Sequence, residues 1–380
     1  MELLLFNPEH DYALADNQPQ YVPLRSAAQF ACDCASLMRY LSDGESTVCD
    51  AYRHVGQEFQ KNFAPLGNAG LITKVTPWGW DAAVVYQLKR MGIPGALLPS
   101  DEQLAKIRAL AHRKTTVAAM EFLRDASLHL DAYPVSPDYL TDIQQVKEYV
   151  EKVPHALFKS PYSGNGRGHL YAHHVCTPTF LRQCEGVLKR QGGILAEKQY
   201  HVVQDFAMEF TCCQGTVTFV GYSLFKTERY GYAGNLMMSD ESILRELSLY
   251  INIVLLWETQ SLVSEFLSRE VAPYYDGNAG VDMFVYQEDG VYKLHPFVEV
   301  NLRKTMGLAA HEVYARRCHP DARGTFRIAY MPSADSMRQF YENQLVESPG
   351  SLEDGLWRSG AFFLTPIHAD TSYAVVVELR

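Results

Sequence analysis

Polar and apolar residues alternate between residues 297 and 303. Side chains on a strand point to opposite faces in turn, so Glu299, Asn301 and Arg303 share one face with Phe297. Carboxylate and amide oxygens are ligands that Mg²⁺ takes, together with waters and substrate phosphates. The pattern therefore predicts a magnesium site on this face. The alternative is the exposed polar face of an ordinary antiparallel hairpin.

The preceding strand alternates as well and places Asp282 on one face. Asp289 and the glycine after it give the strongest short hairpin signal, a two-residue turn. With that turn Asp282 falls opposite Phe297, and Glu299 becomes its diagonal neighbour at about 7–8 Å. Two carboxylates at this spacing can close on a cation. Pro296 speaks against a regular strand, because proline belongs at a sheet edge or a bulge.

A loop of small residues, 160–168, follows a strand that ends at Lys159. Its glycines let backbone N–H groups approach an anion closely, and Lys159 and Arg167 add positive charge. The loop lacks the Gly-Lys-Ser/Thr of a P-loop, and a strand is expected to follow it. An ordinary turn is the alternative.

The first hundred residues alternate strands with helices, which is typical of a parallel sheet flanked by helices. Strands are expected at 3–6 and 71–75, and helices after Asp81 and Ser100. The polar run 9–12 could face a substrate, but Asn-Pro before it starts turns in any case, and a plain turn is the favoured reading.

Further along, 205–213 and 216–222 form a predicted hairpin. The polar, aromatic and glycine-rich run 225–235 is expected to be a functional loop. A long helix is expected from Asp240 onward, and a hairpin near the end of the chain from residue 361 to 377.

Composition limits the function classes. The net charge of −10 disfavours a general nucleic-acid binder. The first residues lack the basic and apolar regions of a signal peptide, and no run reaches 18 apolar residues, so no membrane partner is expected. The 8 cysteines show no Cys-x-x-Cys pair. Reduced thiols in a cytoplasmic protein are the expectation.

The order of these parts resembles the ATP-grasp superfamily of carboxylate-amine and carboxylate-thiol ligases. The resemblance implies mixed α/β and α+β architecture: a Rossmann-like N-terminal domain, the pre-ATP-grasp domain, precedes a two-subdomain ATP-grasp fold. We place the N-terminal domain at 1–112, the small subdomain with the lysine strand and glycine-rich loop at 113–200, and the C-terminal subdomain with the metal site and a C-terminal extension at 201–380.

The resemblance also implies residue roles. In the family, two lysines touch the α/β-phosphates, a small-residue loop closes over them, a hinge carboxylate with its neighbours receives the adenine, and an acid bonds the ribose. In this order the nucleotide-binding residues are Lys114 and Lys159; Ser163, Gly164, Asn165, Gly166 and Arg167; Glu197, Lys198 and Tyr200; and Asp205. The metal ligands are Asp282, Glu299 and Asn301. The catalytic residues are Lys159 and Arg303, which faces the acyl-phosphate.

The implied cofactors are ATP and Mg²⁺ or Mn²⁺. The implied reaction activates a small-molecule carboxylate as an acyl-phosphate for attack by an amine or thiol. Lys304-Thr-Met-Gly307 departs from the pattern of ligases that join alanines, which argues against that substrate. Two alternatives stay open: a kinase-like phosphotransferase, and a nucleotide-binding protein without turnover. The sequence fixes neither the substrates nor the oligomeric state, for which a homodimer is one option.

Overall fold

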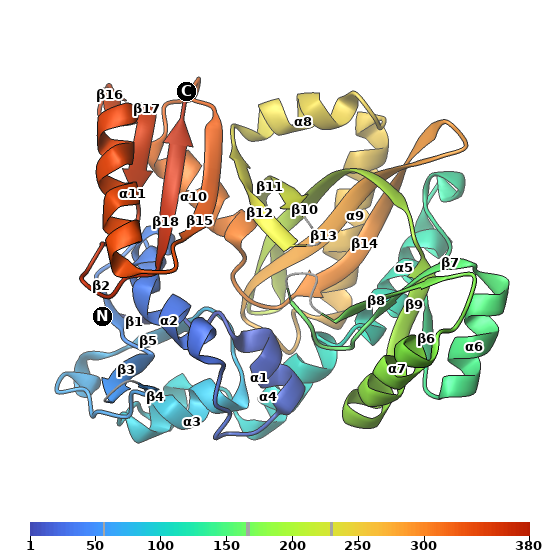
Figure 1. Cartoon of the computed structure of the whole chain (residues 1–380), viewed down its shortest axis with the longest axis horizontal. Helices are drawn as coiled ribbons and strands as arrows, with labels where there is room; N and C mark the ends of the chain where they lie inside the picture. Colours follow the sequence, from blue (N-terminus) through green and yellow to red (C-terminus); the bar gives the residue numbers. More distant parts are fainter. Residues whose placement is uncertain (56–57, 165–167, 229–230) are drawn as a thin grey trace. The chain divides into compact units, whose positions relative to one another are not determined.

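The computed structural model describes residues 1–55, 58–164, 168–228 and 231–380 (Figure 1). The chain divides into two compact units, each built from separate segments. Unit 1 comprises Met1–Ala105, Ala233–Ile243 and Arg303–Arg380, and unit 2 comprises Lys106–Tyr232 and Leu244–Leu302. The limits predicted at residues 112 and 200 stay a prediction.

The first part of unit 1 is the predicted parallel α/β layer. Its sheet has the order β2-β1-β5, with β1 (Glu2–Leu5) parallel to both β2 (Ser46–Cys49) and β5 (Lys74–Pro77). The other elements are α1 (His10–Asp16), α2 (Arg25–Asp33), η1 (Ala35–Leu41), β3 (Tyr52–Val55), β4 (Glu58–Lys61), η2 (Ala69–Leu71), α3 (Ala82–Arg90), η3 (Gly95–Leu97) and α4 (Asp101–Leu110). The sequence placed the third strand of this sheet three residues too early.

The second part of unit 1 comes from the end of the chain. Its strands follow the order β12-β15-β18-β17-β16. The elements are β12 (Gly231–Met237), α10 (Met306–Arg317), β15 (Gly324–Tyr330), α11 (Ala334–Glu347), β16 (Ser351–Glu353), β17 (Leu356–Phe363) and β18 (Tyr373–Leu379). The antiparallel β17–β18 pair is the expected terminal hairpin. One apolar core joins Leu4 and Phe6 of the N-terminal layer to Val375 and Val377 of β18.

Unit 2 contains a four-stranded antiparallel sheet of order β6-β9-β7-β8. Its strands are β6 (Asp138–Leu140), β7 (His155–Lys159), β8 (His169–His173) and β9 (Ile194–Lys198). The helices α6 (Ile143–Lys152) and α7 (Pro178–Gln191) share one apolar core with the sheet, and so cover one of its faces (Figure 1). The other face carries the polar residues Lys159 and Glu197.

The larger sheet of unit 2 has the order β14-β13-β10-β11. Its elements are β10 (His201–Cys213), β11 (Thr216–Glu228), β13 (Gly277–Glu288) and β14 (Val291–Asn301), with the helices α5 (Lys114–Ala126) and α9 (Ile253–Glu270), and η4 (Leu130–Ala132) between α5 and β6. The Thr116 hydroxyl donates to the Val298 carbonyl at 3.3 Å and ties α5 to β14.

Three local predictions are wrong. The run 225–235 was expected to be a loop, but β11 and β12 occupy most of it, because its aromatic residues suit a sheet. The long helix after Asp240 is two helices, α8 (Asp240–Ser248) and α9, because Asn252 caps the second one by accepting from the Val254 N–H at 2.9 Å. The polar run 9–12 was favoured as a plain turn, but α1 begins at His10.

The β13–β14 hairpin has the predicted turn but not the predicted register. Glu288 pairs with Val291 across Asp289 and Gly290, whose φ angles of 51° and 77° are those of a type I′ turn. The pairing then shifts at Pro296, and Asp282 lies directly opposite Glu299 instead of Phe297. Proline has no N–H to give to the ladder, so the strand bulges there and brings the two carboxylates into register.

All eight cysteines are free thiols. No helix in the described part of the chain is long and apolar enough to cross a membrane.

Candidate active site

A cavity of about 960 Å³ lies within unit 2, between the polar face of the small sheet and the strands β10, β11, β13 and β14. The size is typical of a small-molecule or cofactor site. Charged and aromatic side chains share its wall; among them are Arg113, Lys159, His169, Tyr171, Glu197, Tyr200, Asp205, Phe225, Asp282, Phe284 and Glu299.

Lys159 and Glu197 form a buried ion pair on this wall. They lie on the adjacent strands β7 and β9, at positions where Lys159 pairs with Leu195 and Glu197 with Leu157. Their residues are 2% and 4% exposed. Burial alone would raise the pKa of Glu197, but Lys159 beside it holds that pKa well below its usual range.

A buried histidine, His295, lies beside Glu197 of this pair. His295 Nε2 lies 3.3 Å from Glu197 Oε2. Burial lowers the pKa of His295, so the ring is neutral and Lys159 is the cation that balances Glu197.

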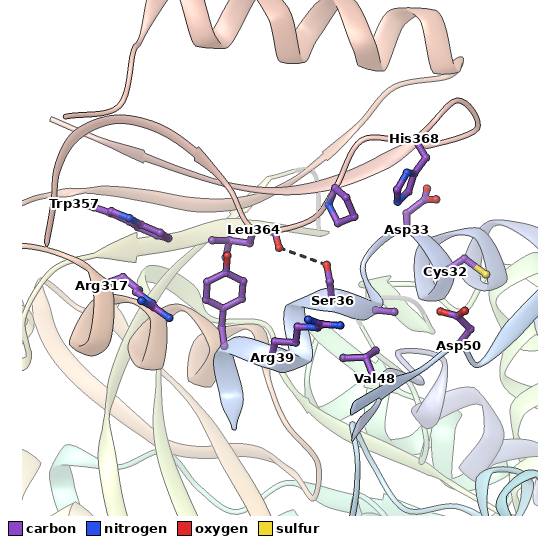
Figure 2. A pocket seen from close by; sticks show the side chains of 13 residues that line it. Cys32, Asp33, Ser36, Arg39, Val48, Asp50, Arg317, Trp357, Leu364 and His368 are labelled. Carbon is purple, nitrogen blue, oxygen red and sulfur yellow. Dashed lines mark hydrogen bonds between the residues drawn. The ribbon is translucent and has the colours of Figure 1, made fainter. Parts of the chain in front are cut away.

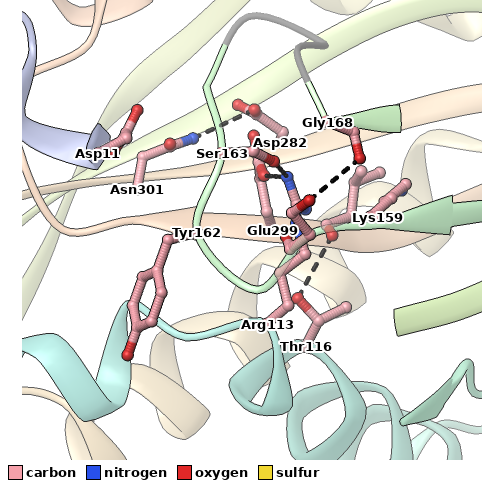
Figure 3. A network of polar contacts seen from close by, with 12 residues as sticks. Asp11, Arg113, Thr116, Lys159, Tyr162, Ser163, Gly168, Asp282, Glu299 and Asn301 are labelled. Carbon is pink, nitrogen blue, oxygen red and sulfur yellow. Dashed lines mark hydrogen bonds and ion pairs between the residues drawn. The ribbon is translucent and has the colours of Figure 1, made fainter. Parts of the chain in front are cut away.

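Asp282 and Glu299, two of the predicted metal ligands, line the cavity, and Asn301, the third, lies beside Asp282 (Figure 3). The bulged register places Asp282 opposite Glu299, and the Asn301 amide donates to Asp282 Oδ2 at 3.1 Å. No three His, Cys, Asp or Glu side chains of the described residues cluster as a metal site. Asp282 and Glu299 offer two carboxylates, and Asn301 offers one amide oxygen. This donor set suits Mg²⁺ when water and phosphate oxygens complete its coordination.

Arg113 is a site residue that the sequence analysis missed. It forms an ion pair with Glu299 and donates to the Ser160 carbonyl at 3.0 Å and the Ser163 hydroxyl at 3.3 Å (Figure 3). It is 5% exposed. Arg113 thus connects Glu299 to the start of the glycine-rich loop. An arginine beside the predicted lysine was the only signal in the sequence.

Lys114, the predicted phosphate ligand, lies elsewhere. It is the first residue of α5, it is exposed, and its Nζ lies 4.6 Å from the centre of the Tyr139 ring. It does not line the cavity, whereas Arg113 does.

The glycine-rich loop is described at both ends. Ser163 accepts from Arg113, Gly164 is buried, and the Ser160 N–H donates to the Gly168 carbonyl at 3.2 Å. The predicted residues Asn165, Gly166 and Arg167 lie outside the described residues.

The predicted adenine and ribose residues separate into two groups. Tyr200 and Asp205 line the cavity, and Asp205 accepts from the Thr227 hydroxyl at 3.0 Å. Burial raises the pKa of Asp205. Lys198 is exposed at the end of β9, pairs with Glu288, and is not on the cavity wall.

The buried cations of the cavity also affect a histidine on its wall. Burial, together with the charges of Lys159 and Arg113, lowers the pKa of His169 to about 4. The two buried cations, Lys159 and Arg113, can bind an anionic ligand such as a phosphate chain when it displaces their carboxylate partners.

Arg303 belongs to unit 1. Its guanidinium donates to both carboxylate oxygens of Asp11, at 3.1 and 3.0 Å, and its backbone forms a bridge with Gly79. These two hydrogen bonds to one carboxylate fix the orientation of the Arg303 guanidinium.

A second cavity, of about 750 Å³, lies within unit 1 (Figure 2). Arg39, Tyr40, Arg317 and Trp357 are on its wall, and the Ser36 hydroxyl donates to the Leu364 carbonyl at 3.5 Å. None of the predicted site residues lines it.

Comparisons with known proteins agree on the fold. No protein-family model matches the chain, and no curated protein matches it. Among solved structures, the ADP complex of N5-carboxyaminoimidazole ribonucleotide synthetase, purK, matches with a TM-score of 0.51 and 11% identity, over 100% of this chain and 91% of that one. Biotin carboxylase from Campylobacter jejuni, in a complex with β-γ-ATP, matches with a TM-score of 0.50 and 11% identity, over 82% of this chain and 72% of that one.

Both of these are ATP-grasp enzymes, and the chain has the ATP-grasp fold with a preceding α/β domain. The predicted fold class is confirmed. At 11% identity the likeness concerns the fold, so the chemistry rests on the residues of this chain.

Proposed function

We propose that the protein is an ATP- and Mg²⁺-dependent ligase that activates a small-molecule carboxylate as an acyl-phosphate for attack by an amine or thiol. One observation carries the proposal: a single cavity of unit 2 brings two buried cations, Lys159 and Arg113, next to the acidic group Asp282 and Glu299. Phosphoryl transfer depends mostly on positioning and on neutralising charge, and these residues do both.

The phosphate chain is held by the cations. Lys159 and Arg113 each neutralise a carboxylate of the cavity in the ligand-free protein. An arriving phosphate chain competes for both. We therefore assign Arg113, in place of Lys114, to the phosphates, together with Lys159 and the described loop residues Ser163 and Gly164.

The nucleoside end is assigned to the other end of the same wall. Glu197, backed by His295, would accept from the adenine amino group, and Tyr200 offers an aromatic face beside it. Asp205 would accept from the ribose hydroxyls.

Asp282, Glu299 and Asn301 would hold the magnesium ion. Their oxygen donors fit this metal, and Arg113 balances the charge of Glu299 in its absence. When bound, Mg²⁺ supplies positive charge at the phosphate oxygens. Arg303 is proposed to face the acyl-phosphate, because its planar fork suits a carboxylate or phosphate better than a lysine does.

The first test is nucleotide binding. Millimolar ATP with Mg²⁺ should raise the melting temperature, because a ligand that binds only the native state stabilises it. Glu299→Ala should lose the Mg²⁺-dependent part of this shift. Asp289→Asn, at the exposed tip of the same hairpin, is the matched control and should keep it. The absence of any shift in the unchanged protein would contradict the proposal.

The second test is the product. A screen of carboxylates with amines and thiols for ADP release identifies substrates, and mass spectrometry of the product identifies the reaction. A new amide or thioester supports the ligase. A phosphate ester alone would make the protein a kinase, and nucleotide binding without turnover in any combination would make it a non-catalytic binder.

A further inference from the structure

A cluster of buried polar residues lies at one edge of the parallel sheet in unit 1. Asn7, Glu9 and His10 follow β1, and Gly79 and Asp81 follow β5. The two strands are parallel neighbours, so both loops leave from their carboxyl ends. In the order β2-β1-β5, β1 is the central strand, and the chain runs first to β2 on one side of it and then to β5 on the other side. In open α/β sheets, ligands bind outside the carboxyl ends of the strands at the point where the strand order reverses in this way.

Asp81 is the centre of the cluster, and both of its carboxylate oxygens have partners. One carboxylate oxygen accepts from the Val84 N–H at 2.8 Å and caps α3. The other accepts from the Asn7 amide at 3.1 Å and lies 3.2 Å from His10 Nδ1. Asp81 therefore positions Asn7, His10 and the start of α3.

His10 is oriented by this contact. An ionised carboxylate only accepts, so Nδ1 carries the hydrogen, and in the neutral ring Nε2 is an acceptor. His10 is 1% exposed, and its Nε2 has no hydrogen-bond partner among the described residues. The ring lies against Gly79, where an added Cβ would come within 2.6 Å of it. Only glycine leaves room for the imidazole in this place.

Glu9 supplies a second acceptor. One oxygen accepts from the Tyr52 hydroxyl, and Oε2 is buried without a partner among the described residues. Burial raises the pKa of Glu9 to about 7, and Asp81 contributes in the same direction. Asp81 therefore affects both residues, through its contact with His10 Nδ1 and through its charge on Glu9. A nearby positive charge would stabilise the ionised carboxylate of Glu9.

Lys61 of β4 belongs to the electrostatic surroundings as well. It is attracted to Asp81 and Glu9, while its burial lowers its pKa. No ion pair involving Lys61 is formed with another described residue, so it does not satisfy Glu9 Oε2.

We propose that Glu9 and His10, held in place by Asp81 and Gly79, bind the primary amino group of a small molecule. Two buried acceptors require hydrogen-bond donors, and leaving them unmade is costly. An ammonium group has three donors and a positive charge, whereas a hydroxyl has one donor and a thiol is a weak donor. The amine-binding site is argued without reference to the ligase reaction. The further statement that the bound amine is the acceptor of that reaction rests on the proposed function. Entry requires local opening of α1, which has only 7 residues.

The test uses pairs of probes that differ only in this group: glycine against glycolate, alanine against lactate, and ethanolamine against ethylene glycol. Each probe is added at about 10 mM, without ATP or metal, because this concentration reveals binding with a dissociation constant in the millimolar range. Histidine-¹⁵N NMR of the unchanged protein reports on Nε2 of His10, whose signals are assigned by their loss in His10→Gln. At least one amine should shift the Nε2 resonance and raise the melting temperature, and its hydroxyl partner should do neither.

Variants locate the effect. Glu9→Gln and His10→Gln should each weaken binding of that amine by at least about tenfold. Glu58→Gln and His368→Gln, at exposed positions of the same unit, are the matched controls and should leave it unchanged. Binding of ATP with Mg²⁺ is measured on the same samples, so that loss of the amine site is distinguished from failure of the proposed function.

Three outcomes would overturn the proposal. The first is that no amine of the panel shifts His10 Nε2, which would leave water as its partner. The second is that amine and hydroxyl act alike. The third is an Nε2 that carries a proton in the absence of ligand, which would make His10 a donor and point to an anion.

Discussion

The cavity of unit 2 and the polar cluster of unit 1 handle buried charge in opposite ways. In the cavity each buried cation has a carboxylate partner, Lys159 with Glu197 and Arg113 with Glu299. In the cluster, Glu9 has no ion-pair partner among the described residues, and Glu9 Oε2 and His10 Nε2 accept no hydrogen bond from them. The cavity also has atoms without a hydrogen-bond partner in the described part of the chain, among them Glu197 Oε2 and Arg113 Nη1, so the two regions differ in their ion pairs. The first arrangement is ready to exchange carboxylates for a stronger anion, and the second is ready to receive a cation. The same molecule therefore presents sites of opposite polarity.

The largest effect on stability is expected from removing one partner of the buried Lys159–Glu197 ion pair. Lys159→Met should lower the free energy of unfolding by about 3–5 kcal/mol, because it leaves the Glu197 carboxylate buried without its cation. The double variant Lys159→Met/Glu197→Gln should regain most of this loss. Urea unfolding of the two variants measures the difference. Equal stability of both would show that the pair is not coupled.

In the unit 1 cluster, removing a buried charge should raise the stability of the protein instead of lowering it. The pKa of Glu9 is raised from 4.5 to about 7, so its stabilising contribution is complete below pH 4.5 and is lost as the pH rises through 7. Glu9→Gln should therefore stabilise the protein at about pH 8, by an amount on the order of 3 kcal/mol.

At about pH 3, well below the unfolded-state pKa of 4.5, the same variant should have almost no effect, since Glu9 is then protonated in both states. Unfolding curves at the two pH values give the comparison, and Glu58→Gln is the exposed control. A pH-independent effect of Glu9→Gln would show that the titration of Glu9 is not responsible.

A third expected effect distinguishes two adjacent residues at the cavity. Arg113→Ala should weaken ATP binding by about 30-fold, or about 2 kcal/mol, because it removes a buried cation and leaves Glu299 without it. Lys114→Ala should change ATP affinity by less than about twofold, as expected of an exposed charge. Titration calorimetry with ATP and Mg²⁺ decides between them, and the reverse order would restore Lys114 as the phosphate ligand.

The smallest expected effect concerns Arg303. Arg303→Lys should leave ATP affinity within about threefold but lower turnover by about tenfold, the pattern of an interaction made chiefly in the transition state. A lysine cannot reproduce the two-point contact with Asp11. Steady-state kinetics with the substrates found by the screen measures this. Unchanged turnover would remove Arg303 from the mechanism.

Local sequence patterns predicted the local structure well. The alternation around Asp282 and Glu299 gave the hairpin, and Asp289 with its glycine gave the turn. The capping box at Ser100 is present, with the Ser100 N–H donating to Gln103 at 2.8 Å. These features depend on residues a few positions apart, so the sequence contains them directly.

Features that depend on distant pairing were not predictable. The bulge at Pro296 changes the register by an amount that sequence spacing does not contain. Which of Arg113 and Lys114 points inward depends on how α5 packs on β14. His10 looked like part of a turn because its partner Asp81 is 71 positions away and meets it only through the pairing of β1 with β5.

The apolar core that joins Leu4 and Phe6 to Val375 and Val377 has a consequence for the order of folding. During synthesis, all residues of unit 2 leave the ribosome by Leu302, so that unit can close while the chain is still growing. The face of the first strand that carries Leu4, and Phe6 after it, is covered only once β18 has been made. We expect ribosome-bound chains that end near residue 330 to protect unit 2 from protease while the N-terminal segment remains sensitive.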